Sequence, residues 1–382
     1  MVPLPFLFHL ILFSLNHSLA EILIFINSGI SCEHIIVNTK ITSSDSFIGV
    51  AGLIKIATGD ISFNSKVIFK LIFYVFQLII HKRTCSVDQK KDRMKEKIYQ
   101  TEKGPIHYLV SGSGSDILPE LVFLPGLTAD HRLFEKQISY FEGKARLLVW
   151  DAPGHASSWP FEMNFSLADK AKWLDKILEL EDFRSPVIIG QSMGGYVGQM
   201  YAQLYPDKLK GFISIDSAPL QRKYMTGLEL WLLKRMEPVY RHYPWKILLK
   251  QGCNGVAVSE YGRSLMHSMM MTYDGNQERY ARLSGHGFKI LAEAVEADLP
   301  YRIPCPALLI CGTRDHAGSC IRYNKAWHRE SGIPIRWIRG AGHNANTDRP
   351  DRINRLIRSF VRSVIRAEYP EKAARVLRKG KR

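Results

Sequence analysis

From about residue 94 onward, the chain alternates short apolar runs with amphipathic stretches, and glycine or proline separates the two. Six runs are continuously apolar, which is typical of strands in a parallel sheet whose two faces are both covered by helices. These runs occupy residues 121–126, 146–151, 187–192, 211–216, 307–312 and 335–340. Residues 97–101 and 106–112 precede them and predict an antiparallel lead-in pair.

Helical patterns separate the apolar runs. Ser166 opens a capping box with Asp169, and apolar positions recur at helical spacing as far as Leu180. Further helices are predicted from Gly194 to Tyr205 and over Pro350–Arg366, because proline suits a first helical turn. Strands that alternate with helices predict an α/β fold with a doubly wound, mostly parallel sheet. Functional residues of such sheets gather at the carboxyl ends of the strands.

The alternation stops between Asp216 and Pro304, where no strand is predicted. Helical stretches at Leu228–Arg241 and Gly262–Thr272 indicate a helical cap over the site. We interpret its methionines and aromatic residues as packing against the main domain. If they faced the site instead, they would indicate an apolar substrate. These residues are Met266, Met269, Met270, Met271, Trp231, Tyr240, Tyr243 and Trp245.

The first 93 residues differ in composition and are rich in isoleucine, phenylalanine and serine. The stretch Pro3–Ala20 has a signal-peptide outline without a basic residue before its apolar core. The run Val67–Ile80 is shorter than the roughly twenty residues that span a bilayer, and the basic residues after it would hold the following domain on the cytoplasmic side. Because Met94 is a plausible natural start, one interpretation is that the extension is not made or is disordered. The other two are that it is a membrane anchor or a cleaved signal peptide.

We therefore expect five parts along the chain. They are an N-terminal extension (1–93), the first part of a core (94–216), a helical cap (217–303), the second part of the core (304–366) and a basic tail (367–382).

The formal net charge of +16 is concentrated near the C-terminus. Residues 352–382 hold eleven Lys or Arg against two Glu, which is more typical of a solvated helix and tail than of a nucleic-acid site. No zinc-finger or RNA-recognition signature accompanies them, so we expect no nucleic-acid partner. The six cysteines form no CxxC pair, and their use fits a reducing compartment such as the cytoplasm. Membrane contact is expected only through residues 1–93.

Gly190-Gln191-Ser192-Met193-Gly194 matches G-x-S-x-G between an apolar strand and a helix. That context predicts a nucleophilic serine on a strained strand-to-helix turn, with its hydroxyl projecting from the edge of the sheet. Gly190 and Gly194 form the supporting turn, since small residues let the backbone segments pass closely. The amino end of the new helix favours negative charge near Ser192.

A second turn, Phe123-Leu124-Pro125-Gly126-Leu127, follows the strand expected to neighbour the nucleophile strand. The backbone N–H groups of Leu127 and Met193 are the predicted oxyanion hole for a tetrahedral intermediate, with Gly126 supporting the turn.

Asp315 and His343 each lie just past the end of a predicted strand. We expect His343 to take the serine proton and Asp315 to fix the tautomer of the imidazole. Asp216 also ends a strand and is the rival acid, but Asp315 follows the cap in a G-x-x-D sequence and is preferred.

The other histidines and the cysteines are not expected to react. His155 is interpreted as bracing its turn, and His131, His286 and His316 as surface or satisfied core residues. Cys311 and Cys320 are not proposed as nucleophiles. Cys305 and Cys311 flank or end an apolar strand-like run and are interpreted as buried thiols that act as small hydrophobes.

At these places the sequence resembles the α/β-hydrolase fold family, in the branch whose members carry a helical cap. The resemblance covers about residues 97–366 and includes Asp151-Ala152-Pro153-Gly154-His155, which is similar to the family's turn after its fourth strand. The family usually has glycine where this chain has Ala156. The resemblance implies the chain order Ser, Asp, His, hydrolysis through an acyl-serine intermediate, no metal and no organic cofactor.

We expect a carboxylesterase-like enzyme whose partner is a small or medium apolar ester, with thioesters or lactones as further substrates. A C–C bond hydrolase and a cofactor-free haloperoxidase or perhydrolase would use the same triad. Two further hypotheses are a ligand-binding receptor with little turnover and a membrane-tethered lipase.

Overall fold

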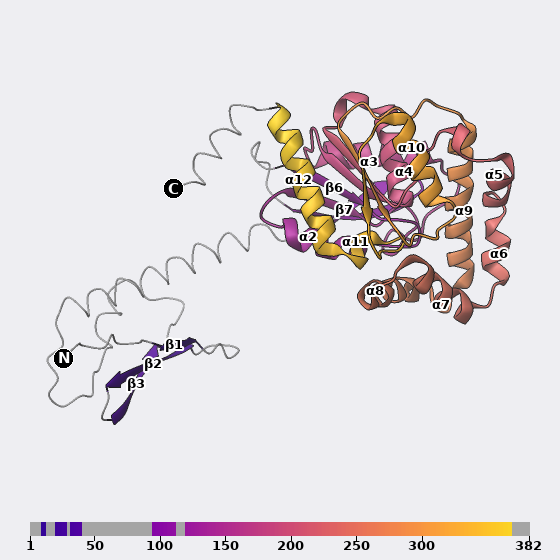
Figure 1. Ribbon diagram of the computed structural model, residues 1–382. Helices are drawn as coiled ribbons and strands as arrows, with labels where there is room; N and C mark the ends of the chain where they lie inside the picture. The colour runs from indigo at the N-terminus through magenta and orange to yellow at the C-terminus, as the bar shows by residue number, and fades with distance from the viewer. Residues whose placement is uncertain (1–8, 13–19, 29–30, 40–93, 112–118, 369–382) are drawn as a thin grey trace. The chain divides into compact units, whose positions relative to one another are not determined.

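The computed structural model describes residues 9–12, 20–28, 31–39, 94–111 and 119–368 (Figure 1). They fall into two units, one before residue 83 and one after it. In the first unit, strands β1 (His9–Leu12), β2 (Ala20–Ser28) and β3 (Ser31–Thr39) form an antiparallel sheet in that order.

Several sequence predictions fall outside the described residues. These are most of the signal-like segment, the apolar run Val67–Ile80 and residues 369–382 of the basic tail. Within the part of the chain that the structure describes, no helix combines the length and the apolar character needed to cross a bilayer.

The second unit contains one eight-stranded sheet, in the order β11-β10-β9-β8-β6-β7-β5-β4. Its strands are β4 (Lys95–Thr101), β5 (Gly104–Ser111), β6 (Glu120–Leu124), β7 (Arg146–Trp150), β8 (Val187–Gln191), β9 (Gly211–Ile215), β10 (Ala307–Gly312) and β11 (Ile335–Ile338). The pairs β4–β5 and β5–β7 are antiparallel and the remaining pairs are parallel. The predicted α/β class and mostly parallel sheet are therefore confirmed.

Helices cover both faces of this sheet (Figure 1). Along β6, Val122 and Leu124 belong to one hydrophobic core, whereas Leu121 and Phe123 belong to the other, because successive side chains of a strand point to opposite faces. The first core is completed by α3 (Leu167–Leu180), α4 (Met193–Leu204) and α10 (Cys320–Ser331), and the second by α2 (Glu135–Phe141), α11 (Ala345–Asp348) and α12 (Pro350–Glu368). Burial on both faces explains why the strands read as continuous apolar runs.

The interval between β9 and β10 is helical, as the sequence predicts, and Figure 1 shows its helices together beside the sheet. It contains α5 (Gly227–Leu233), α6 (Met236–His242), α7 (Trp245–Val256), α8 (Glu260–Met270) and α9 (Gln277–Glu296). The single helix expected over 228–241 is wrong, since the chain breaks between α5 and α6. Pro238 explains the break, because a proline ring clashes with the carbonyl group four residues earlier and fits only in a first turn.

Candidate active site

Ser192 lies on a strained turn between β8 and α4. Its backbone has φ 50° and ψ −116°, a combination that is rare for a residue with a side chain. The turn is tight because a Cβ atom at Gly194 would fall 1.8 Å from the carbonyl oxygen of Leu124, and one at Gly190 would fall 2.4 Å from the backbone of Gly194. Only glycine fits at these two positions, as the G-x-S-x-G motif predicts.

The structure brings Ser192, His343 and Asp315 together in one hydrogen-bonded line. Ser192 Oγ lies 2.8 Å from His343 Nε2, and His343 Nδ1 lies 3.1 Å and 3.0 Å from the two carboxylate oxygens of Asp315. An acceptor-only carboxylate at Nδ1 requires that nitrogen to carry the proton, which leaves the lone pair of Nε2 facing the serine hydroxyl. The line can therefore remove a proton from Ser192.

Opposite charges control the pKa values of this pair. Burial alone would lower the pKa of His343, but the charge and hydrogen bond of Asp315 outweigh it and raise that pKa above its ordinary value. Burial alone would raise the pKa of Asp315, but the charge and hydrogen bond of His343 hold it below its usual range. Asp315 is thus ionised at neutral pH and stabilises a protonated imidazole.

The turn after β6 lies directly beside the serine. A Cβ atom at Gly126 would stand 3.2 Å from the Cβ atom of Ser192, and the side chain of Leu127 packs against Gly287 in α9. The N–H of Met193 is the first of helix α4, so it has no acceptor within the helix. The two predicted oxyanion donors therefore belong to the two segments that flank Ser192.

Asp216, the rival acid, has a different environment. Its carboxylate accepts hydrogen bonds from the backbone N–H groups of Gly312 (2.7 Å) and Ala345 (2.9 Å). Burial and the nearby charge of Asp315 raise its pKa well above the ordinary value. Asp216 thus ties the ends of β9 and β10 to the loop that carries His343, whose imidazole bonds Asp315 instead.

Two residues that sequence reasoning missed also hold the histidine loop. Gln191 donates from Nε2 to the carbonyl oxygen of His343 at 2.9 Å. Asp348 accepts from the backbone N–H groups of Gly342 (2.7 Å), Val258 (3.0 Å) and Ser259 (2.7 Å), so it links this loop to the cap. Gln191 is the variable position of G-x-S-x-G, and Asp348 stands in no motif, so no local signal marks either residue.

The remaining histidines fit structural positions. The ring of buried His155 bonds the carbonyl oxygen of Pro153, and His131 pairs with Asp151 at 2.8 Å. His286 packs edge-on against Phe165, and His316 is exposed. Ala156, which stands where the family usually has glycine, has a φ of 36°, in the region that glycine adopts most easily.

The cap methionines mostly pack inward. Met266, Met269 and Met270 are buried in the second core, whereas Met271 is exposed. Trp231 is about half exposed, with 47% of its surface accessible. Packing therefore explains three of the four methionines.

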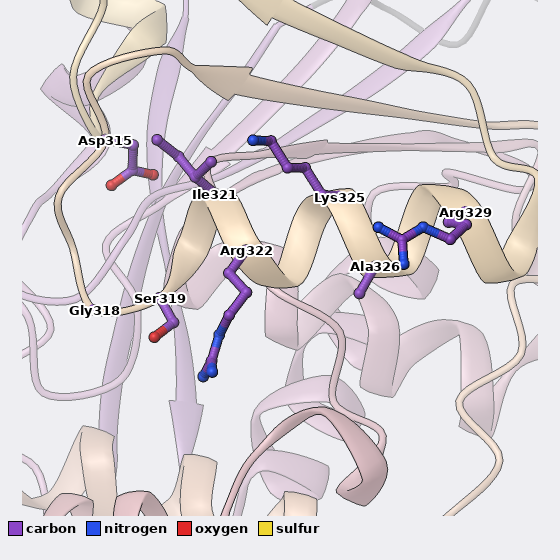
Figure 2. Close-up of a pocket in the computed structure, with 8 residues that line it drawn as sticks. All are labelled: Asp315, Gly318, Ser319, Ile321, Arg322, Lys325, Ala326 and Arg329. Carbon is purple, nitrogen blue, oxygen red and sulfur yellow. The ribbon is translucent and has the colours of Figure 1, made fainter.

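A pocket of about 510 Å³ opens along α10, and Asp315 lies at one end of it (Figure 2). A second hollow, of about 270 Å³, is lined by Asp130, His131 and Asp151 among others. Neither is lined by Ser192 or His343, which are both half-buried. Asp130, His131 and Asp151 have side chains of the kinds that bind metal ions. The carboxylate of Asp130 already pairs with Arg132, however, and that of Asp151 with His131.

Comparisons with known proteins agree with this fold. A family model described as the alpha/beta hydrolase fold matches residues 119–242. The chain has the α/β-hydrolase fold. As is typical of that fold, it places a G-x-S-x-G serine between a strand and a helix.

Relatives within the α/β-hydrolase family are distant. The chain is 25% identical over 237 residues to a 2-succinyl-6-hydroxy-2,4-cyclohexadiene-1-carboxylate synthase of Citrobacter koseri, which covers 61% of this chain and 89% of that protein. It is 24% identical over 251 residues to a protein of Haemophilus influenzae described as an esterase/lipase, covering 64% and 83%. Its fold is similar to that of a thermophilic esterase from Thermogutta terrifontis, with a TM-score of 0.57, 21% identity and coverage of 71% and 99%.

Proposed function

We propose that this hydrolase cleaves carboxylic esters through an acyl-serine intermediate. The observation that carries the proposal is the hydrogen-bonded line from Ser192 Oγ through His343 to Asp315. Its order, its distances and the ionised state of its carboxylate match what activation of a serine hydroxyl requires.

The reaction follows from these positions. Ser192 Oγ attacks the ester carbonyl carbon while His343 Nε2 takes the hydroxyl proton, and the carbonyl oxygen becomes an anion. The backbone N–H groups of Leu127 and Met193 stabilise that oxygen. When the tetrahedral intermediate collapses, the imidazolium returns its proton to the departing alkoxide, and the acyl group stays on Ser192. Water activated by His343 then releases the carboxylic acid and restores the serine.

An apolar ester is the substrate class we favour. Leu127, in the turn after β6, packs against Gly287 of α9, and Val258 packs against Gly342 in the loop that carries His343. Both parts of the site therefore have an aliphatic side chain beside them. The esterase/lipase relative supports ester chemistry, and the synthase relative is the reason to test other bonds as well.

Turnover by the full-length chain tests the proposal. We would follow p-nitrophenolate release from acetate, butyrate and octanoate esters, with Ser192→Ala as the matched control. We expect turnover by the wild type and none above background by the variant. Equal turnover by both would remove Ser192 from the mechanism. Activity on a vinylogous diketone alone would indicate C–C hydrolysis, and stoichiometric ligand binding without turnover would indicate a receptor.

A further inference from the structure

Helix α5 of the cap carries apolar side chains on two opposite sides. Leu230 is buried and Leu233 packs against the first core, as the inner side of a surface helix requires. Leu228, Trp231 and Leu232 lie at helical spacing on the other side, and between 47% and 67% of the surface of each is exposed. A surface helix normally carries polar residues there, so these three side chains need a separate explanation.

The exposed apolar surface continues on α6, where Val239 is 49% exposed. Both α5 and α6 pack against α9, and Figure 1 shows them one after the other along the side of α9 that faces away from the sheet. Between the two helices, the guanidinium of Arg235 lies 4.1 Å from the centre of the Trp231 ring. We define the outer cap face by Leu228, Trp231, Leu232, Arg235 and Val239.

Positive charges dominate the segment that carries this face. Residues 226–250 contain five Lys or Arg, all exposed, against two Glu. Both glutamates are half-buried and already paired, Glu229 with Arg322 at 3.1 Å and Glu237 with Arg241 at 2.6 Å. Exposed tryptophan and leucine beside Lys and Arg are typical of helices that lie on an anionic lipid surface. The five bases are Lys234, Arg235, Arg241, Lys246 and Lys250.

We propose that the outer cap face binds the surface of an anionic lipid membrane. Leu228, Trp231 and Leu232 enter the boundary between head groups and acyl chains, where a tryptophan ring is favoured because it has an apolar body and a polar N–H. Arg235, which stacks on Trp231, binds lipid phosphate beside it. Apolar burial and charge attraction then act together. This contact is additional to the one expected through residues 1–93.

A second copy of this chain fits the same face less well. In a two-fold contact the face would lie against itself, because both subunits use the same patch. Arg235 and the neighbouring bases would then approach the same positive charges of the other copy, and like charges placed together oppose binding. An anionic membrane offers a phosphate to every base and an apolar layer to the exposed leucines and tryptophan. The membrane therefore satisfies both kinds of residue.

The outer cap face is held in place by contacts within the chain. Thr226 and Glu229 form a capping box at the start of α5, and Glu229 also pairs with Arg322 of α10. Helix α9 connects the face to the active site, because its Gly287 packs against Leu127 of the oxyanion turn. An ester dissolved in the membrane is then the substrate class that docking supplies. That substrate class rests on the proposed function, whereas membrane binding does not.

Cosedimentation of the full-length chain with lipid vesicles tests the proposal. Mixed vesicles of phosphatidylserine and phosphatidylcholine would be compared with vesicles of phosphatidylcholine alone. The cap variant replaces the three exposed apolar residues of α5, and a control variant replaces three exposed apolar residues outside the cap. These variants are Leu228→Ser with Trp231→Ser and Leu232→Ser, and Ile98→Ser with Leu180→Ser and Leu204→Ser.

We expect the wild type and the control variant to bind the mixed vesicles equally well. The cap variant should bind them about a hundredfold more weakly, since three apolar side chains no longer leave water. Arg235→Gln should weaken binding to the mixed vesicles about fivefold and change binding to phosphatidylcholine little, because one charge near an anionic surface is lost. Ser192→Ala should bind as the wild type does, so failure of the proposed function would leave this result unchanged.

Wild-type affinity in the cap variant would overturn the proposal, as would equal losses in the cap and control variants. Failure of the wild type to bind the mixed vesicles would also overturn it. If that wild type were a dimer and the cap variant a monomer, a second copy would be the occupant instead. Circular dichroism checks that each variant is folded. If the cap variant is not, Arg235→Gln decides, because unchanged binding of that variant to the mixed vesicles contradicts the proposal.

Discussion

Replacing each of the two buried aspartates with asparagine should separate their roles. In Asp315→Asn, the amide oxygen stays at Oδ1, where the N–H of Ala317 requires an acceptor. The amide nitrogen then takes the place of Oδ2, which is the nearer of the two to His343 Nδ1, at 3.0 Å against 3.1 Å for Oδ1. A donor at that position favours the imidazole tautomer with its proton on Nε2, which cannot accept the proton of Ser192. Loss of the correct tautomer in a Ser-His-Asp triad lowers kcat by about 10⁴, or ~5 kcal/mol of activation free energy.

Asp216→Asn should lower the stability of the protein more than its activity. Its two carboxylate oxygens accept from the N–H groups of Gly312 and Ala345, and an amide can accept only one of these. One buried N–H group loses its partner, which costs about 1–3 kcal/mol of the free energy of unfolding. Because the imidazole of His343 bonds Asp315 rather than Asp216, we expect kcat to fall less than about tenfold.

Ester hydrolysis and thermal unfolding of both variants would be measured on the same preparations. The reasoning predicts a folded, nearly inactive Asp315→Asn and an active, less stable Asp216→Asn. If instead Asp216→Asn lost about 10⁴ in kcat while Asp315→Asn kept most of its activity, the acid would be misassigned.

Three further outcomes follow from the same contacts. Gly194→Ala should lose about 3 kcal/mol of stability or more, since its Cβ atom would fall 1.8 Å from the oxygen of Leu124. Gly255→Ala, with no atom within 4 Å of its added Cβ, should be neutral or gain up to about 1 kcal/mol, and chemical denaturation compares the two variants. Burial lowers the pKa of Lys170 to about 7, so below pH 7 the folded protein bears the full cost of a buried charge, and this cost declines as pH rises toward the unfolded pKa. Lys170→Met should therefore raise stability by up to about 5 kcal/mol at pH 6 and by less at pH 9 in thermal unfolding, and an equal gain at both would contradict the burial argument. Because Asp315 raises the pKa of His343, kcat/KM of the wild type should fall with acid around a midpoint above about 6.5, and a midpoint below that value would show that burial dominates.

The parts of the fold with a repeated local pattern were predictable from the sequence. Continuous apolar runs identified the strands, and the Ser166–Asp169 capping box at the start of α3 is present as expected. The break between α5 and α6 was missed, although Pro238 signals it, because apolar spacing alone does not distinguish one helix from two.

The predicted candidate site depended on strand ends, whereas its supports depend on contacts between distant segments. Ser192, Asp315 and His343 were predicted to lie together because parallel strands bring their carboxyl ends to one edge. Gln191 reaches a carbonyl group 152 residues away, and Asp348 accepts from the backbone N–H of Val258, 90 residues away. Such pairings have no periodicity along the chain, so only the folded arrangement identifies them.

Covalent labelling of Ser192 tests the central claim most directly. The full-length chain and its Ser192→Ala variant would be treated with a fluorophosphonate, and their intact masses recorded. We predict one adduct on the wild type and none on the variant, because only an activated serine attacks this reagent readily. An adduct on both proteins, or none on a folded wild type, would contradict an assembled Ser192-His343-Asp315 site.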